Sequence, residues 1–480
     1  MNKEEIKKIL KKSGLKKGDI VLLHSSYAAI GKVDGGGDSV IDAFLETLGK
    51  DGTLAVPVFG SLGILTELVS KRPGAIKSVH PKAGVAAIGK DAEKICAKHW
   101  EADIAHAENT PYTRIADMGG YICLMGVDQD RNTTLHTVEE LLRLPYLEES
   151  SVAAFETPEG KTVSKSWKFF PGPHRDFVQL DGILRESGKM KTFMIGNAVT
   201  RLIKGREMID IMLETGRKNP AFALCSNPNC ADCVKQRANL NRSILSEESF
   251  KLSVSAALAG RYVPEIVENM KAAGVDAVEL DYLNGMPFNL LKKDFIARAV
   301  MEFKENKISV SSFRFQAIPE NFSEMLDLAL DNSVDRIIIP LAGNFESAIA
   351  EAEEKGISVS LFNTNISSIT VSEALLKLKE KGLKPKFTFN AANFALSGEK
   401  PFLKSYKQKL KRFIDQLDIE DALFSGIFET PANGSAEIKE MISILRCASY
   451  SGFMTLGAKN RIVSNLNDTV SSFISLLKTM

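Results

Sequence analysis

The sequence lacks several features that would mark a special class of protein. Basic and acidic residues nearly cancel, 61 against 60, so the formal charge of +1 creates no overall field for nucleic acid or a membrane surface. No run approaches the roughly 18 apolar residues of a membrane-spanning helix. The opening segment MNKEEIKKILKK has no apolar core of a signal peptide. We therefore expect a cytoplasmic protein that binds neither nucleic acid nor membranes.

Cysteine and histidine are scarce and unevenly distributed. The 480 residues include only six cysteines, too few for a secreted disulfide framework, so a close cluster of them indicates metal ligation or free thiols. All six histidines lie at or before His174, which leaves the second half with none.

The length exceeds what one compact core accommodates, and two domains are expected. Between Asn219 and Glu248 the sequence becomes polar, with Asn-Pro turns and three cysteines, as is typical of a domain boundary. We place the domains at residues 1–245 and 250–480.

The first half is predicted to have an α/β or α+β fold. Buried strands are expected at Asp19–His24, Thr53–Phe59 and Tyr121–Gly126, because these runs are apolar and bounded by turn residues. Asp38 is expected to cap the helix that follows it.

The second half alternates strand and helix patterns eight times in about 230 residues, which predicts a (β/α)8 TIM barrel. The candidate strands begin near Leu252, Val275, Ile308, Arg336, Ile357, Lys386, Leu423 and Gly452.

Three segments of the first half carry candidate chemistry. His24–Gly37 (HSSYAAIGKVDGGG) can turn backbone amides toward a phosphate at a helix start, or can be a tight turn that merely requires glycine. Arg72–Gly89 offers Lys77, Ser78 and His80 beside a proline turn. Asn132–Glu140 (NTTLHTVEE), if it opens a helix, puts His136 and Glu139 on one face.

A histidine held by a carboxylate can remove a proton from an attacking amine. A capped helix start with a solvated carboxylate is the alternative for an isolated His-x-x-Glu pair. The three segments together, however, resemble the aminoglycoside 3-N-acetyltransferase (antibiotic N-acetyltransferase) family from about Lys16 to Asp232. The same resemblance extends over TLAVPVF, NTPYTRI, ICLMGVDQDRNTTLH, PHRDF and IGNA.

The resemblance implies direct transfer of acetyl from acetyl-CoA to an amine of an aminoglycoside, amino sugar or related compound. His136 would be the general base, and Glu139 its orienter or a contact to the substrate amine. The residues implied to bind coenzyme A are Ser25, Ser26, Gly31, Gly35, Gly36, Gly37, Lys77, Ser78 and His80. The residues assigned to the acceptor are His174, Asp128 and Glu140.

Three departures from the family pattern, Val58, Gly84 and Asp176, bear on the acceptor more than on the donor. Acidic residues in the loop Glu101–Glu108, with Asp128 and Asp130, could attract a polycationic acceptor. The remaining histidines are expected to be structural at His24 and at the surface at His99 and His106.

Cys225, Cys230 and Cys233 are spaced Cys-x4-Cys-x2-Cys, which suits a structural zinc ion if a fourth ligand is present. His174 is the best candidate for that ligand, and three reduced thiols in a loop are the alternative. Cys96 and Cys123 are expected to be core thiols.

The second half resembles the xylose isomerase-like sugar phosphate isomerase/epimerase superfamily through VELD, FNAANFALSGEKPF and YSGFMTLG. Asn363, Asn390 and Gly457 stand where that superfamily has metal-binding carboxylates, which makes metal-dependent isomerisation improbable. The polar residues expected at the strand ends are Glu279, Asp281, Arg314, Asn363, Asn365, Asn390, Asn393 and Glu429.

The barrel could bind a sugar, serve as a structural platform, or act as a metal-independent epimerase through Glu279 and Glu429. For the whole chain, an acetyltransferase with an amine acceptor and coenzyme A as partners competes with a non-catalytic binding protein and with a bifunctional transferase and epimerase. Assembly into a homo-oligomer is a further expectation.

Overall fold

The computed structural model describes residues 1–60, 62–157, 160–170, 174–408 and 410–480. It divides into two compact units, Met1–Gln236 and Arg237–Met480. This division falls inside helix α10 (Ala231–Ser246), whereas the sequence interpretation ended and began its domains at residues 245 and 250. No described helix is both long enough and apolar enough to span a bilayer. Pro173, in the PHRDF block, lies outside the described residues.

The described part of the first unit contains a seven-stranded mixed sheet in the order β10-β11-β5-β1-β2-β4-β3. β1 runs parallel to β2 and β5, and the other neighbours are antiparallel. The sheet strands are β1 (Ile20–Ser25), β2 (Thr53–Val58), β3 (Ile76–Lys77), β4 (Gly84–Gly89), β5 (Tyr121–Met125), β10 (Lys191–Ile195) and β11 (Ala198–Lys204).

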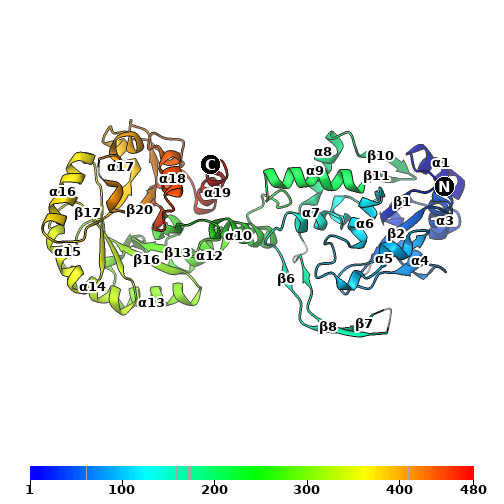
Figure 1. The fold of residues 1–480 in the computed structure, drawn as a ribbon, viewed down its shortest axis with the longest axis horizontal. Helices are drawn as coiled ribbons and strands as arrows, with labels where there is room; N and C mark the ends of the chain where they lie inside the picture. The colour runs from blue at the N-terminus through cyan, green and yellow to red at the C-terminus, as the bar shows by residue number, and fades with distance from the viewer. Residues whose placement is uncertain (61, 158–159, 171–173, 409) are drawn as a thin grey trace. The chain divides into compact units, whose positions relative to one another are not determined.

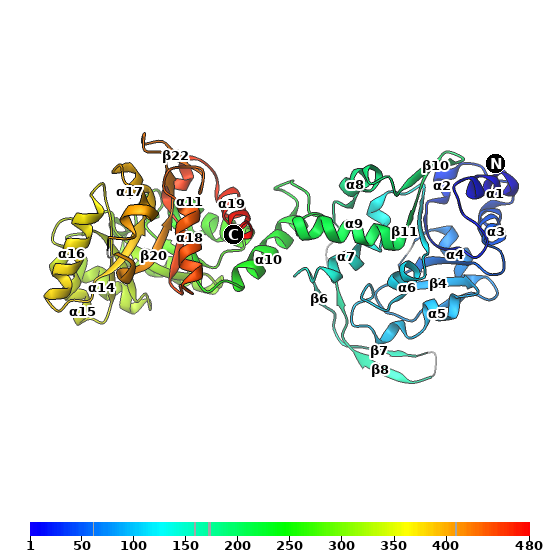
Figure 2. The same cartoon turned by 45° about the horizontal axis from the view of Figure 1, so that its top comes forward.

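Four further strands form two small ribbons, β6 with β9 and β7 with β8. Their bounds are β6 (Glu148–Glu149), β7 (Ala153–Glu156), β8 (Thr162–Lys165) and β9 (Lys168–Phe169). The β7–β8 ribbon extends away from the sheet in both views of the ribbon drawing (Figures 1 and 2).

Helices cover both faces of this sheet (Figure 1). They are α1 (Lys3–Lys12), α2 (Tyr27–Ile30), α3 (Gly36–Leu48), α4 (Ile64–Lys71), α5 (Ala92–Cys96), α6 (Pro111–Asp117), α7 (Leu135–Leu141), α8 (Leu180–Glu186) and α9 (Gly205–Lys218). Val21 and Leu23 of β1 pack with α1, α3 and α4, while Ile20 and Leu22 pack with α5 and α6. A strand buried on both faces is apolar throughout, which is why the β1 run was recognisable in the sequence.

The three predicted strands of the first half are confirmed, but the helix start at Asp38 was wrong. α3 begins at Gly36, and Gly35 precedes it with φ of 80°. That left-handed conformation is open to glycine, so the chain turns into the helix before Asp38. The Asp38 carboxylate instead pairs with Arg72 Nη2 at 2.7 Å.

The described part of the second unit closes eight parallel strands into a barrel, consistent with the expected (β/α)8 architecture. The barrel strands are β12 (Lys251–Ser255), β13 (Ala277–Leu280), β16 (Ser309–Arg314), β17 (Arg336–Pro340), β18 (Ser358–Phe362), β19 (Lys386–Asn390), β20 (Ile414–Ile419) and β23 (Phe453–Leu456). The short strands are β14 (Tyr282–Leu283), β15 (Met286–Pro287), β21 (Asp421–Ala422) and β22 (Phe428–Glu429).

Helices surround the barrel strands (Figure 2). They are α11 (Ala256–Ala259), α12 (Val263–Ala273), α13 (Lys293–Glu305), α14 (Phe322–Asp331), α15 (Phe345–Glu354), α16 (Ser368–Glu380), α17 (Ala391–Leu396), α18 (Ile438–Cys447) and α19 (Leu466–Lys478).

The seventh barrel strand was predicted near Leu423, and this was wrong. The strand is β20, whose sequence IDQLDI sets Asp415, Gln416 and Asp418 among apolar residues. A search for an apolar run passes over such a segment, because it does not anticipate carboxylates that point into a barrel and find partners there.

Candidate active site

A cavity of about 520 Å³ in the first unit collects residues from the ends of β1 and β2 and from the segment after β5. His24 and Ser25 come from β1, Pro57 comes from β2, and His136 comes from α7. Aromatic rings of Phe59, Phe169, Phe170 and Phe177 supply much of the apolar wall. The volume suits a small-molecule ligand.

His136 and Glu139 lie one turn apart on α7, as the sequence predicted. His136 Nδ1 is 2.6 Å from Glu139 Oε2, and Arg175 Nε donates to Glu139 Oε1 at 2.8 Å. The Glu139 side chain is fully buried, whereas the His136 side chain keeps 27% of its surface exposed. With Nδ1 occupied by the carboxylate, Nε2 is the ring nitrogen left to accept a proton from a ligand.

The charge of Glu139 is stabilised despite burial. Burial raises the pKa of Glu139, but the hydrogen bond and charge of His136 and the charge of Arg175 outweigh it and hold the pKa below its ordinary value. The pair is therefore ready to orient the imidazole, in the arrangement required of a general base.

Aromatic rings pack against the imidazole of His136. Phe170 stacks on the His136 ring at 5.6 Å with an interplanar angle of 9°, and Phe177 meets its edge at 5.2 Å. The His106 ring lies 5.3 Å away. The His136 ring is thus held in one orientation at the cavity wall.

Arg175 lies in the PHRDF segment, and the sequence alone does not indicate its role. Its side chain is only 4% exposed, it bonds Glu139, and its Nη1 donates to the carbonyl of His174 at 2.9 Å. A buried arginine must pair with a carboxylate, yet the sequence alone does not show which one.

The charged groups that line the cavity are mostly basic. Lys82, Arg131 and Lys168 contribute cations, while Asp130 is the acidic group among the described lining residues. Asp130 also pairs with Arg131, its Oδ2 lying 3.3 Å from Arg131 Nε. The acidic cleft that the sequence left open is therefore not what these side chains form.

Of the residues assigned to coenzyme A, Ser25 lines the cavity, and the other eight are absent from its described lining. Ser78 Oγ lies 2.9 Å from His99 Nδ1 and accepts from the Val85 amide at 2.8 Å. His80 Nδ1 accepts from the Lys82 amide at 3.2 Å, and its Nε2 lies 3.3 Å from the Ala102 carbonyl. Burial lowers the pKa of His80 to about 4. Both side chains thus support the wall behind the cavity.

Two glycines between β1 and α3 lie where a larger side chain would be crowded. Gly31 has φ of 88°, and a Cβ there would come 3.1 Å from Asn197 Nδ2 in the IGNA block. A Cβ on Gly35 would come 2.3 Å from Ser39 Oγ. These contacts fit the tight-turn interpretation that the sequence left open, and they place the loop against the segment that follows β10.

The residues assigned to the acceptor lie apart from the cavity lining. Asp128 accepts from the Gln129 amide at 2.8 Å and pairs with Arg201 at 3.1 Å. Burial raises the pKa of Glu140, with Glu108 adding to the effect and Lys168 and Arg143 opposing it. Lys77, from the coenzyme A set, is exposed on β3.

The surface positions predicted for His99 and His106 were wrong, because both are buried. His99 is 1% exposed and its Nε2 lies 2.8 Å from the Ala105 carbonyl. His106 lines the cavity, and burial, with His136 nearby, holds its pKa well below the ordinary value. His24, expected to be structural, is buried, which lowers its pKa to about 4, and it also lines the cavity.

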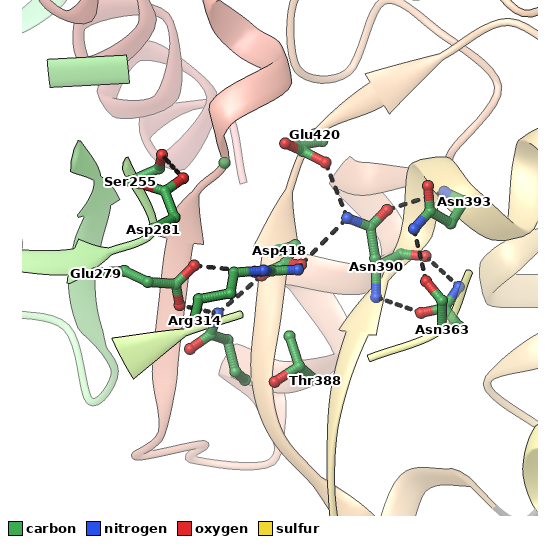
Figure 3. A network of polar contacts seen from close by, with 12 residues as sticks. Ser255, Glu279, Asp281, Arg314, Asn363, Thr388, Asn390, Asn393, Asp418 and Glu420 are labelled. Atoms are coloured by element: carbon green, nitrogen blue, oxygen red, sulfur yellow. Dashed lines mark hydrogen bonds and ion pairs between the residues drawn. The ribbon is translucent and has the colours of Figure 1, made fainter. Parts of the chain in front are cut away.

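The interior of the barrel contains a network of charged and amide side chains (Figure 3). Arg314 donates to Glu279 Oε1 at 2.9 Å and to Asp418 Oδ2 at 2.8 Å. Burial lowers the pKa of Arg314, but these carboxylates outweigh it and raise the pKa well above its ordinary value. Gln416 Nε2 donates to Glu279 at 2.9 Å and to Asp418 at 2.8 Å.

Asn390 extends the network toward Glu420, donating to Asp418 at 3.1 Å and to Glu420 at 2.8 Å (Figure 3). A Cβ on Gly457 would lie 2.2 Å from Glu420 Oε1, so Gly457 makes room for that carboxylate. Asp418 and Glu420 were missed because the seventh strand was misplaced. The polar groups therefore satisfy one another, which removes most of the cost of burying them.

Comparisons with known proteins agree on the first half of the chain. The family model described as aminoglycoside 3-N-acetyltransferase matches residues 22–62 and 59–215. Aminoglycoside N(3)-acetyltransferase IV of a Salmonella species is 27% identical over 227 residues, covering 44% of this chain and 85% of that protein. The comparisons identify the first unit as an acyltransferase.

Two further proteins extend the comparison with the acyltransferase unit. The YokD protein of Bacillus subtilis, named as aminoglycoside N(3′)-acetyltransferase-like, is 28% identical over 246 residues, covering 43% of this chain and 89% of YokD. The structure of aminoglycoside acetyltransferase AAC(3)-IVa, as an apoenzyme, superposes with a TM-score of 0.44 at 27% identity, covering 48% of this chain and 95% of that one.

Proposed function

We propose that the first unit transfers acetyl from acetyl-CoA directly to an amine of an aminoglycoside, amino sugar or related compound. The single observation that supports this most strongly is the His136–Glu139 pair at the wall of the cavity. His136 Nε2 takes the proton of the attacking amine while Glu139 holds Nδ1, and the amine nitrogen bonds to the acetyl carbon as the thiolate of coenzyme A leaves.

Ser25, Ser26 and the glycines Gly31 and Gly35–Gly37 remain the proposed contacts to acetyl-CoA. The serines, Gly31 and Gly35 precede the 13-residue helix α3, and Gly36 and Gly37 are its first two residues, so all of them lie at or before a helix amino end, which favours phosphate. Ser78 and His80 contribute indirectly in this proposal, because their hydrogen bonds support the cavity wall.

Cavity charge bears on the choice of acceptor. Three cations and one paired carboxylate repel an acceptor that carries several ammonium groups and favour one with few positive charges or with a phosphate. The names of the relatives favour aminoglycosides. Within the proposed class, the charge pattern therefore favours amino sugars and nucleotide-linked amino sugars.

The test compares aminoglycosides, simple amino sugars and nucleotide-linked amino sugars with radiolabelled acetyl-CoA in the full chain. Lys168→Gln should lower kcat/KM most for a phosphate-bearing acceptor if Lys168 faces it, and should raise the KM for acetyl-CoA if Lys168 serves coenzyme A instead. Preference for the most highly charged aminoglycosides would reject the charge argument.

His136→Ala tests the base itself. We expect kcat to fall roughly 100- to 10,000-fold with nearly unchanged affinity for coenzyme A, because the variant removes the proton acceptor but not the donor site. Turnover close to that of the unmodified protein would remove His136 from the mechanism and favour the non-catalytic alternative.

For the barrel, the closed network favours a structural platform over an epimerase. Glu279 is 1% exposed and paired with Arg314, so it has no free carboxylate to offer a substrate. Glu429 lies on β22, opposite Asp421 in a two-stranded ribbon outside the barrel wall.

A further inference from the structure

Four soft metal ligands converge from three segments of the first unit. They are His174, Cys225 and Cys230 in the loop after α9, and Cys233 in the first turn of α10. One ligand atom from each lies within 4.8 Å of every other. None of the six cysteines forms a disulfide in the described part of the chain, so no disulfide accounts for the group.

The spacing approaches that of a filled metal site. Zinc binds sulfur at about 2.3 Å and imidazole nitrogen at about 2.0–2.1 Å, so a tetrahedral site has nitrogen–sulfur edges of about 3.6 Å and sulfur–sulfur edges of about 3.8 Å. His174 Nδ1 lies 3.2 Å from Cys233 Sγ and 3.3 Å from Cys230 Sγ. Small adjustments would therefore place an ion at bonding distance from all four ligands.

Free thiols explain this arrangement less well. One imidazole nitrogen faces two sulfur atoms at once, although it can make only one hydrogen bond along its ring plane. In addition, the Cys225 amide points at Cys233 Sγ at 3.4 Å. Hydrogen bonds from backbone amides to sulfur are a usual outer support of cysteines that bind metal.

We propose that His174, Cys225, Cys230 and Cys233 bind one zinc ion. Three cysteines and one histidine complete a tetrahedron and leave no open position for water or substrate, so the site is structural. This assigns His174 to the metal and not to the acceptor, in keeping with its place outside the cavity lining.

The position of the site gives it a consequence for the acyltransferase, and this part rests on the proposed function. Arg175 follows His174 directly, donates to the His174 carbonyl at 2.9 Å, and donates to Glu139 at 2.8 Å. A metal that fixes residue 174 therefore fixes the arginine that holds Glu139, which in turn orients His136. His174 and the cysteines are positioning residues in this account.

The metal is tested first on the full chain without any substrate. Protein purified without chelators should contain about one equivalent of zinc, and cobalt(II) substituted for it should give the visible absorption of a tetrahedral ion with thiolate charge transfer. Cys230→Ser and Cys233→Ser should lose most of the metal. Cys447→Ser, an exposed free cysteine in the second unit, is the matched control and should retain it.

Two results would overturn the proposal. One is purified protein that holds less than a tenth of an equivalent and shows no cobalt–thiolate absorption after reconstitution. The other is that the thiols of residues 225, 230 and 233 in the native protein react freely with a thiol reagent when no chelator is present. His174→Cys is the control for misfolding, because a site with four cysteines should keep the zinc.

The positioning role has its own measurement. In His174→Ala, kcat should fall about 10-fold or more while the KM for acetyl-CoA changes little, as expected when an outer support of a site is lost. His174→Cys should restore kcat together with zinc. If zinc is present but its loss leaves kcat unchanged, the metal proposal stands and the link to His136 is rejected. If zinc is present and no acceptor is turned over, only the proposed function fails.

Discussion

Glu139→Gln gives the sharpest test of the pair at the cavity wall, because the surroundings dictate which way the new amide must face. Arg175 can only donate, and its Nε lies 2.8 Å from Glu139 Oε1. The glutamine oxygen must therefore turn toward Arg175, which directs the amide NH₂ group at His136 Nδ1. To accept from that group Nδ1 must lose its proton, so the proton moves to Nε2, and the base cannot accept one from the amine.

A tautomer reversal of this kind removes the base without moving it. We expect kcat to fall roughly 100- to 10,000-fold, which corresponds to about 2.7 to 5.4 kcal/mol of lost transition-state stabilisation. Affinity for coenzyme A, measured by calorimetry, should stay within about threefold. Nitrogen-15 spectra of labelled histidine report the tautomer independently of activity.

The double variant Glu139→Gln with Arg175→Met tests the cause. Without the arginine the amide is free to turn its oxygen to Nδ1, so part of the lost activity should return, at least about 10-fold over Glu139→Gln alone. Two outcomes would refute the reasoning: a Glu139→Gln enzyme with kcat within threefold of the unmodified protein, or a histidine spectrum that keeps the Nδ1 proton.

Two further predictions concern the barrel. Arg314→Met should destabilise the second unit by about 3 to 5 kcal/mol in calorimetric unfolding, because Glu279 and Asp418 lose their buried counter-charge. The exposed control Lys381→Met should change the free energy of unfolding by about 0.5 kcal/mol or less. Equal effects of the two variants would mean that the carboxylates are hydrated or neutral. Burial raises the pKa of Asp281 from 3.8 to about 6, so the folded state binds more protons between these values and stability falls by up to about 3 kcal/mol as pH rises through this window. Asp281→Asn should flatten that part of the unfolding profile, and an unchanged slope between pH 4 and 6 would exclude Asp281 as its source.

Local patterns were enough where the residue type itself limited the structure. The β1 run is apolar on both faces and is bounded by turn residues, which favours a buried strand. His-x-x-Glu on a helix puts the two side chains on one face. The alternation of eight strands and helices likewise indicated a barrel before any contact was known. These features depend on neighbours within about a turn of helix or a single strand.

Partners from distant parts of the chain were decided only by tertiary structure. Glu139 receives its second hydrogen bond from Arg175, and Arg314 finds Asp418 across 104 residues of sequence. Burial of His99 and His106 depends on the same long-range packing. Pattern reasoning treats charged and polar residues as solvent-facing, which holds unless a partner from elsewhere meets them in the interior. The sequence by itself determined the two-part architecture and the His136–Glu139 pair. The folded chain determined the charge of the cavity, the contacts of Arg175 and the closed network of the barrel. These three features depend on side chains that only folding brings within hydrogen-bond distance.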